Sequence, residues 1–402
     1  MTVIDVMPLE QFAKQSLPIE LNGSCGANRV RHKKALIAAT NDIEAMECWL
    51  AEYSHRATTL RNYRKDGERL LLWAIVERRK PLSSLTGDDL LAYSNFLADP
   101  QPRERWCGPK LAKGGKRWSK QWKPFVGPLK QTARAASLRN IKSLFNYLVE
   151  VHYLENDPMI PVRRQLKQER LNDERVSKVQ ERIFDLEEWD VLVKIINQTS
   201  ELMTEPWEQI RLRYIVALFY FAGLRDHELE SHTMSAFRRL RDLRTGEDQW
   251  WLHIVGKGGR LKRIPVNDLL LAELKIYRRF LKFSELPEAN ETEALVRSLK
   301  TGKGITGRRV NQLLKTLSYQ VAERFEVTDP EKAKRLRKLS AHWFRHQFCS
   351  IQDHIGISKR NIKDNAGHAS DQTTEIYMHA FDNHRYEEMQ RMPWSIKKET
   401  QE

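Results

Sequence analysis

Six residues in four separated segments have side chains that together could act on a phosphate group. They are Arg225, Lys257, His342, Arg345, His368 and Tyr377. A free tyrosine phenol has a pKa of about 10, so it is a poor nucleophile at neutral pH unless nearby cations favour the phenoxide. A guanidinium group is planar, always charged and able to bind a phosphate through two hydrogen bonds. The set therefore indicates attack by a phenol that is activated by cations.

The spacing within each segment supports this interpretation. Arg225 comes two residues after Gly223, which follows a long apolar run and occupies the position where a helix would stop. Lys257 lies in a GKGG turn between two strand-like segments. His342 and Arg345 are three residues apart, which places both on one face of a helix. The order and spacing of all four segments together would rarely arise by chance.

Each segment also has an ordinary structural interpretation. An arginine after a helix stop is commonly a cap or a salt-bridge partner, and a lysine in a hairpin is usually solvated. A histidine and an arginine on one helix face often have a structural role. Tyr377 lies between Ile376 and Met378, and a tyrosine in such a place is usually a packing residue with a polar tip.

The charge balance points to a polyanionic partner. The chain has 402 residues, with 68 Lys and Arg against 53 Asp and Glu, and a formal net charge of +15. A surplus of this size is typical of proteins that bind nucleic acid, although a merely basic enzyme is the alternative. Hydrophobic residues make up 41% of the chain, which suffices for buried cores, and the length suits two domains.

The remaining composition excludes several classes of protein. The cysteines Cys25, Cys48, Cys107 and Cys349 are far apart and show no metal-ligand spacing, so we expect free thiols in a reducing cytoplasm and no zinc site. No apolar run approaches the ~20 residues of a membrane span. The first residues carry two acids before any base, which is unlike a secretory signal. We expect no metal, no cofactor and no membrane association.

The first part of the chain is predicted to be a helical bundle. Residues 1–40 show little periodic pattern and are interpreted as an N-terminal tail that could contain one short helix. Residues 41–160 contain helical segments that start near Thr58, Leu85 and Ala136. In the third segment, apolar residues recur at steps of three and four, which strongly predicts a helix; they are Leu138, Ile141, Leu144, Phe145 and Leu148.

A basic, aromatic stretch interrupts this bundle. Residues 103–130 hold nine Lys and Arg and a single acid, Glu104, with Trp106, Trp118 and Trp122 interleaved. Such uncompensated charge could neutralise phosphates and release counterions; a solvated charged loop is the alternative. The predicted DNA-contacting residues in the two basic segments of this domain are Arg61, Arg64, Lys65, Lys113, Lys116, Arg117, Lys120 and Lys123.

The second domain is predicted to be mostly helical with a small sheet. Residues 161–183 are polar without an apolar stripe and are interpreted as a basic linker that is flexible or weakly helical. Residues 184–402 are the second domain with a C-terminal tail. The apolar run 214–222 predicts a buried helix, and QWWLHIV and RLKRIPV flank GKGG as a β-hairpin. The fold class is thus mainly α, in two domains, with a small antiparallel sheet.

Four motifs together resemble the tyrosine recombinase, or phage integrase, family. They are GLRxxEL around Arg225, GKGG around Lys257, HxxRH at 342–346, and GH followed after eight residues by Tyr377. The resemblance covers roughly residues 184–385, and the helical domain is similar to the family's core-binding (SAM-like) domain. Trp343 and Phe344 stand where the family usually has smaller or aliphatic residues, and Ala366 stands where Leu is common; these departures change packing rather than chemistry. The chain is also longer than the compact members of the family, with the extra length in the N-terminal tail and in residues 103–130.

The resemblance implies a role for each candidate residue in a two-domain clamp on DNA. Tyr377 would attack the phosphate, and both arginines would bind its non-bridging oxygens. His342 would serve as general base or hydrogen-bond partner of the tyrosine, and His368 would donate a hydrogen bond to the phosphate. Lys257 would protonate the departing 5′ oxygen. Glu228 would orient the site, and neither metal nor ATP would be required.

The resemblance further implies site-specific recombination through a 3′-phosphotyrosine and a Holliday junction. The expected partners are double-stranded DNA sites, a homo-tetramer on two such sites, and accessory DNA-bending or sister recombinase proteins. We expect a cytoplasmic, nucleoid-associated protein of a mobile genetic element. A type IB topoisomerase, which uses similar chemistry without synapsis, is one alternative. A non-catalytic DNA-binding protein on the same fold is another, but it would have no need of Tyr377 or Lys257.

Overall fold

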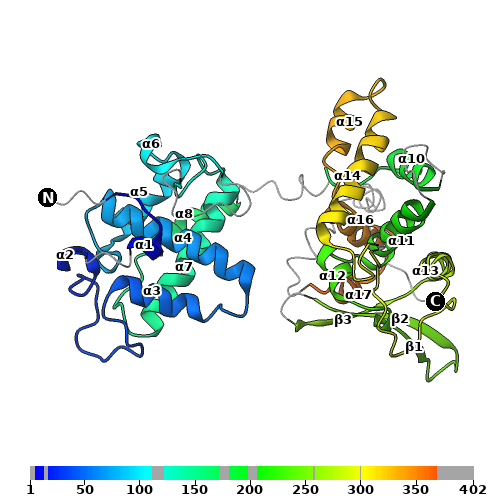
Figure 1. Ribbon diagram of the computed structural model, residues 1–402, viewed down its shortest axis with the longest axis horizontal. Coiled ribbons are helices and arrows are strands. Elements are labelled where there is room, and N and C mark those ends of the chain that lie inside the picture. The colour runs from blue at the N-terminus through cyan, green and yellow to red at the C-terminus, as the bar shows by residue number, and fades with distance from the viewer. Residues whose placement is uncertain are drawn as a thin grey trace, which may run out of the picture. The chain divides into compact units, whose positions relative to one another are not determined.

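The chain forms two compact units, Met1–Asp173 and Glu174–Glu402, in the computed structural model (Figure 1). Helices dominate both units, and the second also contains one small antiparallel sheet. This confirms the expected fold class. The structure describes residues 5–12, 17–110, 122–171, 181–197, 206–256, 259–298 and 300–368.

Two long helices form the centre of the first unit. Helices α4 (Ala57–Val76) and α7 (Gln131–Glu150) pack against each other. The five apolar residues predicted to line α7 are all at most 1% exposed, because the three- and four-residue steps place them on one helix face. The other helices are α1 (Leu9–Phe12), α2 (Ile19–Asn22), α3 (Asp42–Ala51), η1 (Leu82–Ser84), α5 (Gly87–Ala98), α6 (Arg103–Trp106) and α8 (Ile160–Leu171).

The described residues before position 41 pack on this bundle, whereas the sequence suggested a separate tail. Val6 and Leu9 are buried in the core of the unit, and the Leu9 backbone N–H donates to Glu68 over 2.8 Å. Arg29 forms an isolated antiparallel bridge with Leu154. These contacts join residues far apart in the sequence, so no local periodicity reports them.

The base of the basic loop is anchored by its aromatic residues. Trp106 and Trp122 are buried, and the Trp106 indole N–H donates to Glu77 over 2.8 Å. The Arg69 guanidinium lies over the Phe125 ring, 4.3 Å from its centroid. These two tryptophans therefore serve the core rather than a DNA surface. Residues 111–121, including Trp118, lie outside the described part of the chain.

The predicted linker is helical in its first half. Helix α8 runs from Ile160 to Leu171, and Val162 is buried against the first unit. Val162 and the partly buried Leu166 attach this helix to the core, and these two apolar residues are too few to form a stripe over residues 161–183. Residues 172–180 lie outside the described part of the chain.

The second unit is built around α11 (Pro206–Ala222), the helix predicted from the apolar run. It packs against α13 (Asp268–Phe280) and α16 (Ala341–His354). The remaining helices are α10 (Leu186–Asn197), α12 (Asp226–Ser231), η2 (Met234–Ala236), α14 (Gly307–Glu323), α15 (Pro330–Leu336) and α17 (Lys359–Ala366). No described helix is long and apolar enough to cross a membrane.

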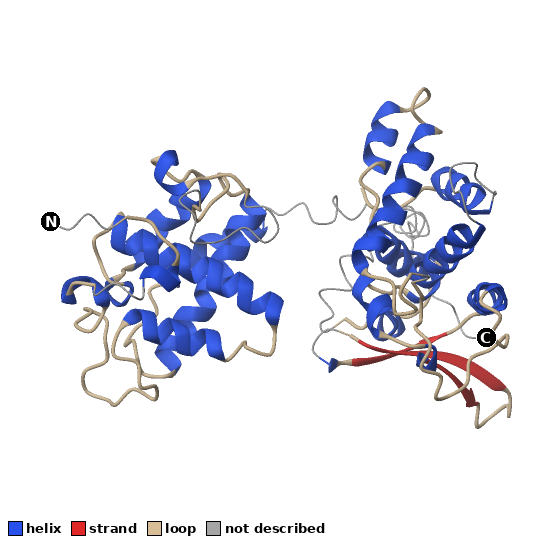
Figure 2. Cartoon of the chain, in the orientation of Figure 1, coloured by secondary structure: helices blue, strands red, loops and turns tan. Residues whose placement is uncertain are grey.

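A three-stranded antiparallel sheet lies along one side of these helices (Figure 2). Its strands are β1 (Phe237–Arg241), β2 (Asp248–Val255) and β3 (Leu261–Pro265), in the order β1-β2-β3. Strands β2 and β3 are the predicted hairpin. Strand β1 was not predicted, because FRRLR buries only its first residue and lacks the alternation that marks a half-buried strand.

Candidate active site

Arg225 is positioned by the abrupt end of α11. Gly223 adopts φ +55°, and a Cβ atom there would lie 2.3 Å from Cδ1 of Phe348. Only glycine fits this left-handed turn against α16. The chain then becomes extended at Arg225, which caps α12 with φ −89° and ψ 153°. The predicted helix stop therefore sets both the place and the direction of Arg225.

A buried carboxylate holds Arg225 from three residues away. Glu228 Oε2 accepts from the Arg225 backbone N–H over 2.9 Å, and Oε1 accepts from Arg225 Nη1 over 3.0 Å. The Glu228 side chain is fully buried, while that of Arg225 is 29% exposed. Glu228 thus fixes both the backbone and the guanidinium of Arg225 and leaves the arginine partly open to a ligand.

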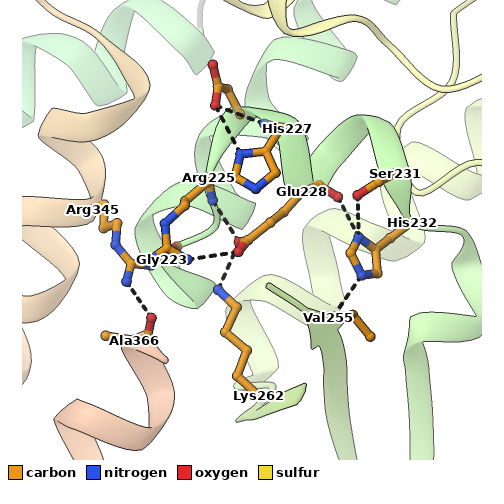
Figure 3. A network of polar contacts seen from close by, with 11 residues as sticks. Gly223, Arg225, His227, Glu228, Ser231, His232, Val255, Lys262, Arg345 and Ala366 are labelled. Carbon is orange, nitrogen blue, oxygen red and sulfur yellow. Dashed lines mark hydrogen bonds and ion pairs between the residues drawn. The ribbon is translucent and has the colours of Figure 1, made fainter. Parts of the chain in front are cut away.

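Lys262 completes this cluster from the inner face of the sheet. Its Nζ donates to Glu228 Oε2 over 2.9 Å, and its side chain is only 2% exposed (Figure 3). Burial raises the pKa of the Glu228 carboxyl, but Lys262 and Arg225 lower it by more, so the net shift is downward. Burial lowers the pKa of the Lys262 ammonium to about 8. At neutral pH the cluster therefore contains two cations and one anion.

The end of β2, which precedes Lys257 in the sequence, lies beside this cluster. A Cβ atom on Gly256 would lie 3.4 Å from Glu228 Oε1 and 3.8 Å from Arg225 Nη1. The preceding residue, Val255, donates its backbone N–H to His232 Nε2 over 2.9 Å. The other ring nitrogen of His232 lies 2.9 Å from the Glu228 carbonyl oxygen, so His232 joins α12 to the end of β2 (Figure 3).

Arg345 connects the segments before Arg225 and His368. Its guanidinium is 2% exposed; Nη1 donates to the Gly223 carbonyl over 2.6 Å, and Nη2 donates to the Ala366 carbonyl. Each acceptor lies two residues before a candidate site residue. Helix α16, which supplies Arg345 and His342, therefore brings the end of α11 next to the end of α17 (Figure 3).

His368 follows the left-handed end of α17. Gly367 has φ +62°, and a Cβ atom there would lie 3.1 Å from Cδ of Lys262. Arg260 Nη1 donates to the His368 carbonyl oxygen over 3.1 Å. The residues around the β2–β3 turn thus contact His368 as well as the Arg225 cluster.

The site histidines are neutral at neutral pH. Burial, followed by the charges of Arg345 and Arg225, lowers the pKa of His368 to about 3. Burial and then Arg345 lower the pKa of His342 below its usual 6.5. His346, whose ring centroid is 4.4 Å from that of His342, has a pKa lowered to about 3 by burial and then by His342. A neutral imidazole can accept a proton at one nitrogen and donate a hydrogen bond from the other.

The structure brings together four of the six predicted site residues: Arg225, His342, Arg345 and His368. The charges of the two arginines lower the pKa of both histidines, and Arg345 bonds to the segments before Arg225 and His368. Lys257 and Tyr377 lie outside the described residues. Among the described residues, no group of His, Cys, Asp or Glu side chains is arranged to hold a metal ion.

The predicted DNA-contacting residues fall in the first unit. Arg61, Arg64 and Lys65 lie on α4, where Arg64 and Lys65 each have a carboxylate 3.9 Å away, on Glu10 and Asp66 respectively. Lys123 is half-buried beside Trp122. Lys113, Lys116, Arg117 and Lys120 lie outside the described part of the chain.

Sequence reasoning missed three residues of the site: His232, Arg260 and Lys262. One signal for Lys262 was present. In RLKRIP, the alternation of a strand places Lys262 on the same face as Ile264, which is the buried face. A lysine at an inward position needs a carboxylate partner, and Glu228 is that partner.

Comparison with known proteins identifies the family. The model of the phage integrase family matches residues 190–384. The chain is 25% identical to the tyrosine recombinase XerC of Roseiflexus castenholzii over 325 residues, covering 80% of this chain and 83% of the relative. It is 28% identical to the tyrosine recombinase XerA of Pyrococcus furiosus over 223 residues, covering 56% and 66%. The family model covers most of the second unit, and both relatives are tyrosine recombinases, so the second unit matches this family, as the motifs predicted.

Solved structures share the fold. A XerH site-specific recombinase bound to its palindromic difH substrate in a post-cleavage complex matches with a TM-score of 0.56 at 16% identity, covering 88% of this chain and 85% of that one. The Tn1549 transposon integrase in complex with transposon right end DNA matches with a TM-score of 0.52 at 15% identity, covering 87% and 99%.

Proposed function

We propose that this enzyme cleaves and rejoins double-stranded DNA at specific sites through a 3′-phosphotyrosine formed by Tyr377. The strongest support is that Arg225, Arg345 and His368 come together. The Arg345 guanidinium donates hydrogen bonds to the backbone just before Arg225 and just before His368. Two arginines and a neutral imidazole suit a phosphodiester, because a phosphoryl transition state spreads negative charge over its equatorial oxygens.

The reaction is a balanced exchange of phosphoester bonds. The phenol oxygen of Tyr377 attacks phosphorus, its proton passes to the neutral His342, and the bond from phosphorus to the 5′ oxygen breaks. Lys257 gives a proton to that departing oxygen. The 3′ phosphate stays on the tyrosine, so the phosphoester bond is conserved and a 5′ hydroxyl can reverse the step without ATP.

The cations replace the metal ions that many phosphoryl-transfer enzymes use. Arg225 and Arg345 bind the non-bridging oxygens, and His368 donates a further hydrogen bond. Each positioned donor or acid contributes roughly 10²–10⁴-fold to the rate. Neither a metal nor another cofactor has a step in this mechanism.

Recombination by a homo-tetramer on two DNA sites, through a Holliday junction, is the proposed outcome of this chemistry. The names of the relatives support it, since XerC and XerA are tyrosine recombinases. The basic residues of the first unit would hold the duplex, and accessory DNA-bending or sister recombinase proteins would assist. We propose that the protein belongs to a mobile genetic element and acts on DNA in the cytoplasm.

The test begins with fragments of the source genome incubated with the protein in EDTA. After denaturation, DNA still attached to protein is sequenced, and the recovered site is rebuilt as a nicked duplex whose cleavage is irreversible. A trapped adduct together with exchange between two sites supports the proposal. An adduct with relaxation of any supercoiled DNA would indicate a topoisomerase instead. Binding without an adduct would indicate a non-catalytic protein, and an adduct that requires Mg²⁺ would contradict the metal-free mechanism.

A further inference from the structure

Lys262 is one of the most enclosed cations in the second unit. Its side chain is 2% exposed, and its ammonium is 2.9 Å from Glu228 Oε2. The same carboxylate holds both the backbone and the guanidinium of Arg225. A buried lysine is costly unless it is paired, so its presence at this point calls for a role that an apolar residue on β3 could not perform.

The stem of Lys262 contacts the other side of the site as well. Its Cδ and Cβ atoms approach Gly367 so closely that a Cβ atom there would lie 3.1 and 3.5 Å from them. Helix α17 packs against β3 at this point. The aliphatic part of Lys262 therefore contacts Gly367, the residue before His368, while its ammonium binds Glu228.

We propose that Lys262 is a positioning residue that sets the place and the effective charge of Arg225 through Glu228. This inference rests on the proposed function, since Arg225 is assigned there to the phosphate. Lys262 is distinct from Lys257, whose proposed task is to protonate the leaving oxygen. The ammonium of Lys262 donates to Glu228 over 2.9 Å, and we assign it to that carboxylate rather than to the substrate.

The electrostatic reason follows from counting charges. With Lys262 in place, one carboxylate is shared by two cations, and Arg225 keeps a net positive charge for the phosphate. Without Lys262, Glu228 would neutralise Arg225 alone and hold it more tightly. In a buried site such a change of one unit of charge is weakly screened, so it should lower the rate of cleavage far more than it alters the binding of DNA.

The charge of Lys262 can itself be lost as the pH rises. Its pKa is about 8 because burial outweighs the attraction of Glu228. The other groups facing it are Arg225 and Arg345, which also favour the neutral amine, together with the imidazole of His368 and the thiol of Cys349. Deprotonation above about pH 8 should therefore mimic removal of the lysine.

The experiment compares Lys262→Met, Lys262→Arg and Arg263→Met in the full-length protein. Arg263 is the matched control, because it is the next cation on β3 and lies on the exposed face. On the nicked duplex, Lys262→Met should slow formation of the covalent adduct about 100-fold, as removal of a charge-stabilising group does, with DNA affinity changed less than about threefold. Lys262→Arg should restore most of the rate, and Arg263→Met should match the wild type.

The pH profile separates this role from mere packing. The substrate is a duplex with sulfur at the 5′ bridging position, whose departure needs no proton from Lys257. The ratio of the wild-type rate to the Lys262→Arg rate cancels the titration of Tyr377 and His342. We expect that ratio to be constant below about pH 8 and to fall about tenfold per pH unit above it, since arginine stays charged.

Two results would overturn the inference alone: a wild-type rate in Lys262→Met, or a ratio that does not change with pH. Should Lys262→Met fail to fold, the pH dependence of Lys262→Arg still decides. Absence of any adduct in the wild-type protein would instead overturn the proposed function, and this inference with it.

Discussion

The guanidinium of Arg345 donates a hydrogen bond to the carbonyl oxygen of Gly223 over 2.6 Å. A second donor of the same side chain binds the Ala366 carbonyl. One buried arginine thus connects the end of the helix before Arg225 with the end of the helix before His368. The side chain of Arg345, which the sequence motifs assign to the phosphate, thus also holds the site together through hydrogen bonds to the main chain of two other segments.

Replacing Arg345 with lysine should separate the effect of its positive charge from the effect of its two hydrogen bonds. Lysine keeps the positive charge but cannot donate in two fixed directions, so one carbonyl loses its partner. A lost hydrogen bond to a charged donor costs about 2 kcal/mol. We expect unfolding in urea to report a loss of about this size for Arg345→Lys, and adduct formation to fall at least about 100-fold. Full activity in this variant would contradict the two-sided role of Arg345.

Gly223→Ala should destabilise the second unit more than an equivalent change elsewhere. Both Gly223 and Gly356 have positive φ, +55° and +82°, so alanine is strained at either position by about 1 kcal/mol. Only at Gly223 would the new Cβ atom also meet Phe348, at 2.3 Å, while nothing lies within 4 Å at Gly356. We expect Gly223→Ala to lose a further ~1–3 kcal/mol. Equal losses in urea titrations of the two variants would show that the close approach is unimportant.

The buried histidines should make the second unit sensitive to acid. His346 and His368 have folded-state pKa values of about 3, below the usual 6.5. Between these values the unfolded chain binds protons that the folded chain does not, so stability falls as the pH falls below about 6.5. At about pH 5 each histidine costs about 2 kcal/mol relative to neutral pH.

The variant His346→Gln tests this dependence. It removes one titrating group, so its stability loss between about pH 7.5 and about pH 5 should be smaller than that of the wild type by about 2 kcal/mol. The matched control is His354→Gln, because His354 is exposed on the same helix. An unchanged pH dependence in His346→Gln would mean that this histidine is not kept neutral by the fold.

The basic loop should contribute to DNA affinity through its charge alone. If Lys113, Lys116, Arg117 and Lys120 each neutralise a phosphate, changing all four to alanine should flatten the plot of log K against log salt concentration by about 3–4 units. A duplex of random sequence suffices as the probe. The control exchanges lysine and arginine at the same four positions, which should preserve the slope. A wild-type slope in the alanine variant would make the segment an ordinary solvated loop.

Local patterns in the sequence predicted the parts of the site that depend on neighbouring residues. The glycine stop before Arg225 ends α11, and the three-residue spacing places His342 and Arg345 on α16. The hairpin was predicted because its strands are adjacent in the chain. Each of these features is encoded within a few residues, so periodicity and turn chemistry suffice to recognise them.

The contacts that join these parts could not be predicted in the same way. Lys262 meets Glu228 across 34 residues, and Val255 meets His232 across 23 residues. Arg345 meets Gly223 across 122 residues. Such contacts depend on the packing of whole elements, and β1, which has a single buried residue, carries too little pattern to indicate that the sheet has three strands.

The most direct measurement of the central claim is the identity of the residue that becomes linked to DNA. The chain contains 11 tyrosines, so the trapped adduct should be digested and its DNA-linked peptide sequenced by mass spectrometry. We predict that the modified residue is Tyr377 and that Tyr377→Phe binds DNA with wild-type affinity but forms no adduct. An adduct on another residue, or one that persists in Tyr377→Phe, would contradict the mechanism.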